Sequence, residues 1–404
     1  MPTAYNPKRL FLASCITMVV LGLVFAIRGD TIAALGSQFS LTNEQLGWIS
    51  GAAFWGFLAS ILIGGPLCDL LGMHRLLGLA FLGHTGGVLL TIFATGFWTL
   101  WIATLAIGLA SGFIEASINP LIATVYPNQK TQRLNALHAW FPWGIVIGGL
   151  AAYLMTALGV GWQAKTALIL VPTLGYGLLY FGPKFPATER VQSGVSTGAM
   201  YRELLRPSFL FLAFCMLLTA STELGPNQWI PAILTNTAGM QGILVLVWIN
   251  GLMALGRMFA GPIMHRLSSL GVLNGAAVLS AIGLLGLSYA TTPVVAMAAS
   301  TVFALGITYF WPTMLGLTSE RFPSGGAVAL AMMGGAGNLS VAITLPLIGR
   351  IYDLKGPQLA LRYVTILPLL LIGAFFIMRL MDNARGGHHA VLREAHSRMS
   401  GGNK

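Results

Sequence analysis

The segment 65–69 reads GPLCD and ends one long apolar stretch, while the segment 261–265 reads GPIMH and ends another, 196 residues later (261 minus 65). A second pair of proline-containing motifs is repeated at a similar offset. Asn119-Pro120 and Trp311-Pro312 are 192 residues apart (312 minus 120). Because the two offsets nearly agree, the sequence predicts a chain built as two similar halves in tandem.

The composition excludes a soluble globular protein. Only 8% of the 404 residues are charged and 56% are hydrophobic, whereas an ordinary soluble domain carries about 25% charged residues. The three cysteines (Cys15, Cys68 and Cys215) are an odd number and lie in or beside apolar stretches. A disulfide-based secreted scaffold is therefore excluded too, and the chain is predicted to cross a membrane many times.

A membrane-spanning helix needs about 20 mostly apolar residues, and the sequence offers twelve such stretches. They are 10–36, 45–68, 75–96, 98–124, 136–159, 163–182, 207–235, 241–264, 270–290, 293–318, 326–350 and 358–381. The predicted fold is therefore an all-α membrane protein. We expect a six-helix half at 1–182, a polar linker at 183–206, a second six-helix half at 207–381 and a polar tail at 382–404.

The lysines and arginines predict the orientation, since cytoplasmic loops carry an excess of both. Of the 22 basic residues, sixteen fall in segments on the side of the N-terminus, and four (Lys165, Arg350, Lys355 and Arg362) fall on the other side. We expect both termini in the cytoplasm of a bacterial-type plasma membrane. Topology and contact with membrane lipid then explain the positive charge, and no nucleic-acid partner is expected. We expect the protein to be a monomer.

Three acids fall inside predicted spans: Asp30, Glu115 and Glu223. An acid at the bilayer centre costs about 2.5–3.5 kcal/mol on insertion scales, and such residues by default mark a substrate pathway or a proton relay. Two cations, Arg28 and Arg257, lie at similar positions in the spans. The alternative interpretation is a set of static ion pairs that hold helices together, and Arg257 near a helix end fits that interpretation.

Helical spacing predicts which of these groups can meet. Glu115 and Asn119 are four residues apart and share a face, and Asn135 and His138, three apart, share another. Arg28 and Asp30 are two apart and point in different directions, so we expect Arg28 to pair with Glu115 from another span. Asp30 then has no cation on its own helix face and is the preferred proton carrier, with Glu115 as the second.

The seventh span carries a dense polar group at 223–229, ELGPNQW. Pro226 is expected to interrupt the helix, and interrupted helices at membrane depth line cavities. Glu223, Asn227 and Gln228 would bond sugar hydroxyls, and Trp229 would stack on the apolar face of the ring. The alternative for Trp229 is a place in the aromatic belt at the outer membrane surface. Trp311 invites the same two interpretations.

The stretch 65–75, GPLCDLLGMHR, resembles the signature of the loop between spans two and three in the major facilitator superfamily. This resemblance implies that Asp69 and Arg75 brace the cytoplasmic ends of neighbouring helices and act in gating. The alternative is that they cap helices and mark topology.

A second resemblance is narrower. Residues 115–120 (EASINP), Pro127, residues 133–138 (RLNALH) and Asp30 before FSLTN at 39–43 are similar to the fucose–proton symporter family. It implies that Asp30 and Glu115 couple proton movement to sugar recognition. Two departures, His138 in place of glutamine and the additional Arg28, leave the sugar open and admit an acidic substrate.

These observations favour a proton-coupled importer of a small polar solute, with a monosaccharide first, that works by alternating access. Its binding residues would include Arg28, Asn119, Asn135 and His138. The alternative is an exporter of drugs or metabolites from the same superfamily, although exporters of apolar compounds need a broad apolar cavity. An enzyme is disfavoured because no nucleophile triad, metal-ligand cluster or phosphate-binding glycine loop is evident, and no cofactor is expected.

Overall fold

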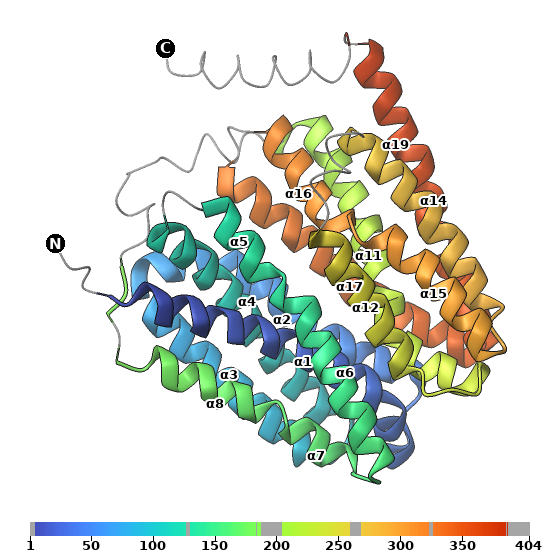
Figure 1. Ribbon diagram of the computed structural model, residues 1–404, viewed down its shortest axis with the longest axis horizontal. Helices are drawn as coiled ribbons and strands as arrows, with labels where there is room; N and C mark the ends of the chain where they lie inside the picture. Colours follow the sequence, from blue (N-terminus) through green and yellow to red (C-terminus); the bar gives the residue numbers. More distant parts are fainter. Residues whose placement is uncertain are drawn as a thin grey trace.

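The computed structural model describes residues 5–126, 130–182, 184–186, 204–258, 268–322, 326–384 and 386. Within these ranges the regular structure is helical, and no strand occurs. Figure 1 shows two groups of helices side by side, one blue to green and one yellow-green to red. The two groups correspond to the two halves of the chain.

The first group holds α1 to α8. Their bounds are α1 (Pro7–Phe39), α2 (Asn43–Leu71), α3 (Met73–Ile92), α4 (Phe97–Val125), α5 (Lys130–His138), α6 (Trp140–Ala157), α7 (Trp162–Ala167) and α8 (Leu170–Tyr180). Helices α5 and α6 follow one another along a single path, as do α7 and α8, so the group makes six crossings (Figure 1).

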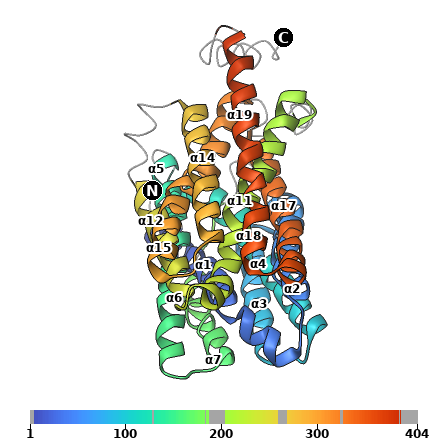
Figure 2. The same cartoon turned by 90° about the vertical axis from the view of Figure 1, so that its right-hand side faces the viewer.

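The second group holds the helices from α11 onward. Their bounds are α11 (Pro207–Thr237), α12 (Ile243–Met258), α14 (Ser269–Ser288), α15 (Pro293–Ile307), α16 (Phe310–Arg321), α17 (Gly326–Lys355), α18 (Pro357–Val364) and α19 (Ile366–Ala384). Here α15 with α16, and α18 with α19, make single crossings. The long helices of this group run roughly alongside one another in Figure 2.

The predicted twelve spans are confirmed. Ten helical segments of the described chain are long and apolar enough to cross a membrane, and α12 is a shorter apolar helix of 16 residues. The broken pair α7–α8 supplies the remaining crossing. The segment between α8 and α11 lies mostly outside the described residues, as does the second GP motif at 261–265.

Pro226 does not interrupt its helix, contrary to the prediction. Helix α11 continues from Pro207 to Thr237 with Pro226 and Pro231 inside it. A membrane helix tolerates internal proline where neighbouring groups satisfy the freed backbone, and the residues around Pro226 are buried against neighbouring helices. The polar residues at 223–229 are therefore presented by regular helix.

The two groups meet closely where the N-terminus of α2 reaches the C-terminal part of α17. The carboxylate of Asp353 accepts hydrogen bonds from the backbone amides of Asn43 and Glu44 at 3.0 and 2.8 Å, and from Asn43 Nδ2 at 2.8 Å. These amides have no partner within their own helix, and their partial positive charge favours an acid. Gly47 permits the approach, because a Cβ there would lie 2.5 Å from the Leu345 carbonyl oxygen.

The polar tail begins later than predicted. Helix α19 continues to Ala384, and Asp382, expected to be the first tail residue, is buried. Its carboxylate pairs with Arg321 at the end of α16 at 2.5 Å. The side chain faces a cation on a neighbouring helix, which explains why an acid is tolerated inside this helix.

Candidate polar sites at membrane depth

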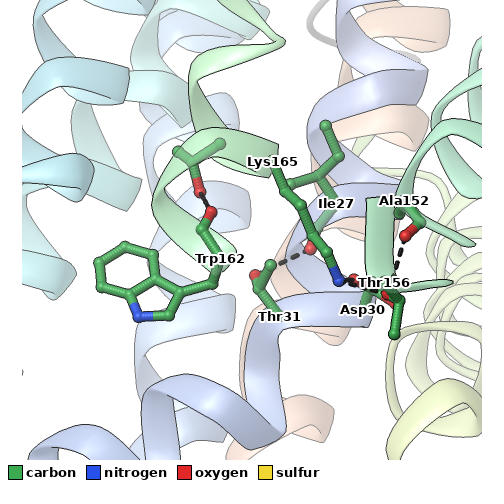
Figure 3. Close-up of polar contacts among 8 residues, drawn as sticks. Ile27, Asp30, Thr31, Ala152, Thr156, Trp162 and Lys165 are labelled. Carbon is green, nitrogen blue, oxygen red and sulfur yellow. Dashed lines mark hydrogen bonds and ion pairs between the residues drawn. The ribbon is translucent and has the colours of Figure 1, made fainter. Parts of the chain in front are cut away.

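Asp30 lies in a buried polar cluster in the first group of helices (Figure 3). Lys165 Nζ donates to Asp30 Oδ2 and to Thr156 Oγ1, both at 2.6 Å. The side chains of Asp30 and Lys165 are each 10% exposed. The three residues come from α1, α6 and α7, so one ammonium group links three helices.

This cluster corrects the sequence interpretation in two ways. Lys165 was counted with the outer loops, yet it lies in the first turn of α7 and is buried. Asp30, expected to lack a cation, has this one. The side chain of Lys165 brings its ammonium group to Asp30, and a buried carboxylate needs such a partner. The signal was available in the sequence, because Lys165 falls inside the sixth predicted span, 163–182.

The fourth span carries a second polar chain. Asn119 Nδ2 donates to Glu115 Oε2 at 2.8 Å, as the spacing predicted. His138 Nε2 lies 3.0 Å from Asn119 Oδ1. Because the amide group of Asn119 already donates to Glu115, its carbonyl oxygen accepts the proton of His138 Nε2. His138 is exposed, so this chain connects a half-buried acid to an accessible imidazole. The side chain of Asn135 lies outside the described residues.

Arg28 does not pair with Glu115, contrary to the prediction. Its Nε donates to Gln228 Oε1 of α11 at 3.0 Å. Its Cζ lies 5.9 Å from the ring centroid of Phe25 and 5.7 Å from that of Phe54. Helix α11 comes close to α1 at this level, since a Cβ on Gly29 would lie 3.0 Å from Gln228 Nε2. Arg28 therefore contacts the other half of the chain.

Glu223 pairs with a cation in the second group of helices. Arg257 Nη2 lies 3.2 Å from Glu223 Oε1, and Arg257 Nε donates to the Thr308 carbonyl oxygen at 3.0 Å. The contact joins α11, α12 and the α15–α16 crossing. Two buried acceptors beside it, Glu223 Oε2 and Asn227 Oδ1, have no hydrogen-bond partner in the part of the chain that the structure describes.

Trp229 is neither an interface residue nor open to a solute. It is fully buried, and its Nε1 donates to the Leu345 carbonyl oxygen of α17 at 3.2 Å. Its ring lies 6.0 Å from that of Tyr352, centroid to centroid. Trp311 is also used in helix packing, because its ring lies 2.8 Å from where a Cβ on Gly337 of α17 would be. The amphipathic character of tryptophan could not distinguish these roles.

The predicted gating pair is only partly described. The side chain of Asp69 lies outside the described residues, and Arg75 is exposed near the start of α3. Two of the cations predicted to lie on the outer side, Arg362 and Lys355, contact aromatic residues. Arg362 Cζ lies 4.2 Å from the ring centroid of Tyr289, and Lys355 Nζ donates to the hydroxyl of Tyr363 at 2.6 Å.

Known proteins resemble this chain at low identity. A sodium-dependent glucose transporter 1 of Danio rerio is 27% identical over 170 residues, which cover 40% of this chain and 29% of that protein. A D-xylose transporter of Levilactobacillus brevis is also 27% identical, covering 40% of this chain and 36% of that protein. The chain thus spans about a third of these relatives. A hexuronate transporter of Bacillus subtilis is 24% identical, covering 70% of this chain and 74% of that protein.

Solved structures show the same fold. The crystal structure of a D-xylose-proton symporter superposes with a TM-score of 0.76 at 15% identity, covering 92% of this chain and 97% of that one. The nucleoside transporter NupG superposes with a TM-score of 0.75 at 13% identity, covering 92% and 98%. The sequence model of the Major Facilitator Superfamily matches residues 10–343. With twelve crossings in two groups and a family match over most of its length, the chain belongs to the Major Facilitator Superfamily of membrane transporters, as its loop signature suggested.

Proposed function

We propose that this protein is a proton-coupled symporter that imports a monosaccharide by alternating access. The observation that carries the proposal is the buried carboxylate of Asp30, held by Lys165 at 2.6 Å. An ionisable pair at membrane depth is the kind of group that proton-driven carriers use. Similarity to glucose, D-xylose and hexuronate transporters supports a sugar-like solute.

Proton binding at Asp30 would loosen contacts among the helices of the first half. While Asp30 is ionised, the ammonium group of Lys165 ties α1 to α7 and, through Thr156, to α6. A proton on the carboxylate removes the negative charge, and breaking a buried ion pair is costly. Arg28, two residues from Asp30 on α1, contacts Gln228 of the other half. A charge change at Asp30 thus acts close to the junction that must rearrange.

Glu115 is the proposed second proton site. Its contact with Asn119, and the contact of Asn119 with exposed His138, connects it to the surface of the protein. The unpartnered acceptors Glu223 Oε2 and Asn227 Oδ1 are suited to hydroxyl groups of a solute. We further propose that Asp69 and Arg75 act in gating and that both termini lie in the cytoplasm of a bacterial-type plasma membrane.

The test uses the purified protein in liposomes that enclose a pH-sensitive dye. D-Xylose, D-glucose, L-fucose, D-glucuronate and two lipophilic cations are added outside, and the internal pH is followed. A sugar that acidifies the interior is the expected result, and Asp30→Asn should abolish the signal. Thr31→Val is the matched control, because among the described residues the Thr31 hydroxyl bonds the Ile27 carbonyl of its own helix alone, at 2.8 Å. This variant should retain transport.

Two results would contradict the proposal. Sugar uptake without acidification of the liposome interior would show that transport is not coupled to protons. Movement of the lipophilic cations in exchange for protons, with no response to any sugar, would favour an exporter instead.

A further inference from the structure

The charges at membrane depth do not balance locally. Besides the pair of Arg321 and Asp382, the described chain holds three acids there, Asp30, Glu115 and Glu223, and three of its cations, Arg28, Lys165 and Arg257, lie in the same segments. Two of the cations have an acid: Lys165 pairs with Asp30, and Arg257 pairs with Glu223. Among the residues that the structure describes, no acid forms an ion pair with Arg28. Of these three cations, Arg28 is the one that pairs with no acid among the described residues.

The surroundings of Arg28 supply no counter-charge. Its Nε has a neutral amide partner, Gln228, and the rings of Phe25 and Phe54 flank the group. Its Nη1 is buried and has no hydrogen-bond partner among the described residues. Glu115, the remaining acid, is bonded to Asn119. Burying a charge is costly unless it is paired, so a guanidinium with an unpartnered, buried Nη1 indicates that its partner is not part of the chain.

Arg28 also lies at the junction between the two halves of the chain. It extends from α1, has Phe54 of α2 beside it and bonds α11 of the other half. In carriers built from two repeats, the solute binds at the interface between them. The guanidinium of Arg28, which lacks an acidic partner among the described residues, therefore lies at this interface.

We propose that the solute carries a carboxylate, that this carboxylate binds the guanidinium of Arg28, and that the substrate class is the sugar acids, with hexuronates as its simplest members. The planar, forked donors of arginine match a carboxylate better than they match a single hydroxyl. The sugar part of this inference rests on the proposed function, whereas the acid part rests on Arg28 alone.

The first experiment measures thermal unfolding of the purified full chain in detergent. D-Glucuronate and D-galacturonate are compared with D-glucose and D-galactose, which differ from them only at C6. We expect one or both acids to raise the Tm and the matched hexoses to leave it unchanged. Arg28→Gln should abolish the shift. Arg28→Lys, which keeps the charge but not the fork, should weaken apparent affinity by about tenfold, the equivalent of about 1.4 kcal/mol.

The second experiment needs no ligand. Arg28→Gln removes an unpaired charge and should raise the Tm of the empty protein. The matched control Arg257→Gln leaves Glu223 without its cation and should lower the Tm. An equal decrease in the Tm of both variants would assign Arg28 a structural role and overturn the proposal.

Protection by hexoses equal to that by the acids, or protection by neither acid, would also overturn it. Binding in detergent requires no proton gradient. A failure of proton coupling in liposomes would therefore leave these two results standing, and the two proposals fail separately.

Discussion

Two of the buried ion pairs, Lys165–Asp30 in the first half and Arg257–Glu223 in the second, are built differently; the described chain also holds a third, Arg321–Asp382. In the first half, Lys165 and Asp30 are 2.6 Å apart, both side chains are 10% exposed, and Thr156 gives the ammonium a second acceptor. In the second half, Arg257 and Glu223 are 3.2 Å apart, and the Arg257 side chain is 24% exposed. Glu223 Oε2 beside it has no partner.

This difference separates two roles that a buried charge can take. A pair with short contacts on several helices holds those helices together only while both members are charged, which suits a proton-dependent contact. A looser pair with an unused acceptor retains hydrogen-bonding capacity, which suits contact with a solute. The comparison therefore assigns coupling to the first half and solute contact to the second, and each assignment can be tested by substitution.

The largest effect is expected from Lys165→Met. Methionine keeps an apolar stem but leaves the carboxylate of Asp30 buried without a cation, and breaking such a pair typically costs about 3–5 kcal/mol of unfolding free energy. Thermal unfolding in detergent measures the loss. The double variant with Asp30→Asn should recover most of it, because no buried charge remains. A single variant as stable as the unaltered protein would show that the pair contributes nothing.

Glu223→Gln is expected to cost less, about 1–2 kcal/mol, because solvent partly screens the Arg257 that is left behind. Its main effect should be on the solute. A transported sugar should raise the Tm of this variant much less than it raises the Tm of the unaltered protein. This loss of protection should be proportionally larger than the loss of stability. If Glu223→Gln destabilised the protein more than Lys165→Met, the comparison between the two halves would be reversed.

The sequence was a good guide to helices and to contacts within one helix. Long apolar stretches place twelve crossings, since the bilayer itself sets their length. The bond between Glu115 and Asn119 follows from a spacing of four residues. Contacts between helices were not accessible in the same way. Asp30 and Lys165 are 135 residues apart, and Arg28 and Gln228 are 200 residues apart.

Those contacts depend on how each helix is rotated and how closely its neighbours pack. The spacing of residues along one span gives no information about either. The same reason explains why the position of Trp229 was predicted wrongly. The side chain of Trp229 suits a membrane interface, a stacked sugar or a packed core equally well, and only the approach of α17 decides that it is buried. The sequence named the acids correctly as unusual, but it did not supply their partners.

A smaller effect is expected from Thr156→Val, which removes one of the two oxygen atoms that Lys165 Nζ contacts. The ion pair with Asp30 remains, so the loss should be about 1 kcal/mol, the usual contribution of a single hydrogen bond. Thermal unfolding again measures it. A variant as stable as the unaltered protein would show that the contact between Lys165 and Thr156 contributes nothing to stability.

The smallest stability change is expected from Asn227→Leu, at the looser pair. Asn227 Nδ2 donates to the Glu223 carbonyl oxygen at 2.9 Å, while its Oδ1 is buried without a partner. Losing one bond and one unsatisfied group together should change the unfolding free energy by less than about 1 kcal/mol, because these two contributions oppose each other. Solute binding should nevertheless weaken, since the leucine offers no acceptor to a hydroxyl. A protein that keeps its stability and loses its affinity would separate the solute contact from the packing around it, whereas unchanged affinity would show that the unpartnered oxygen faces no solute.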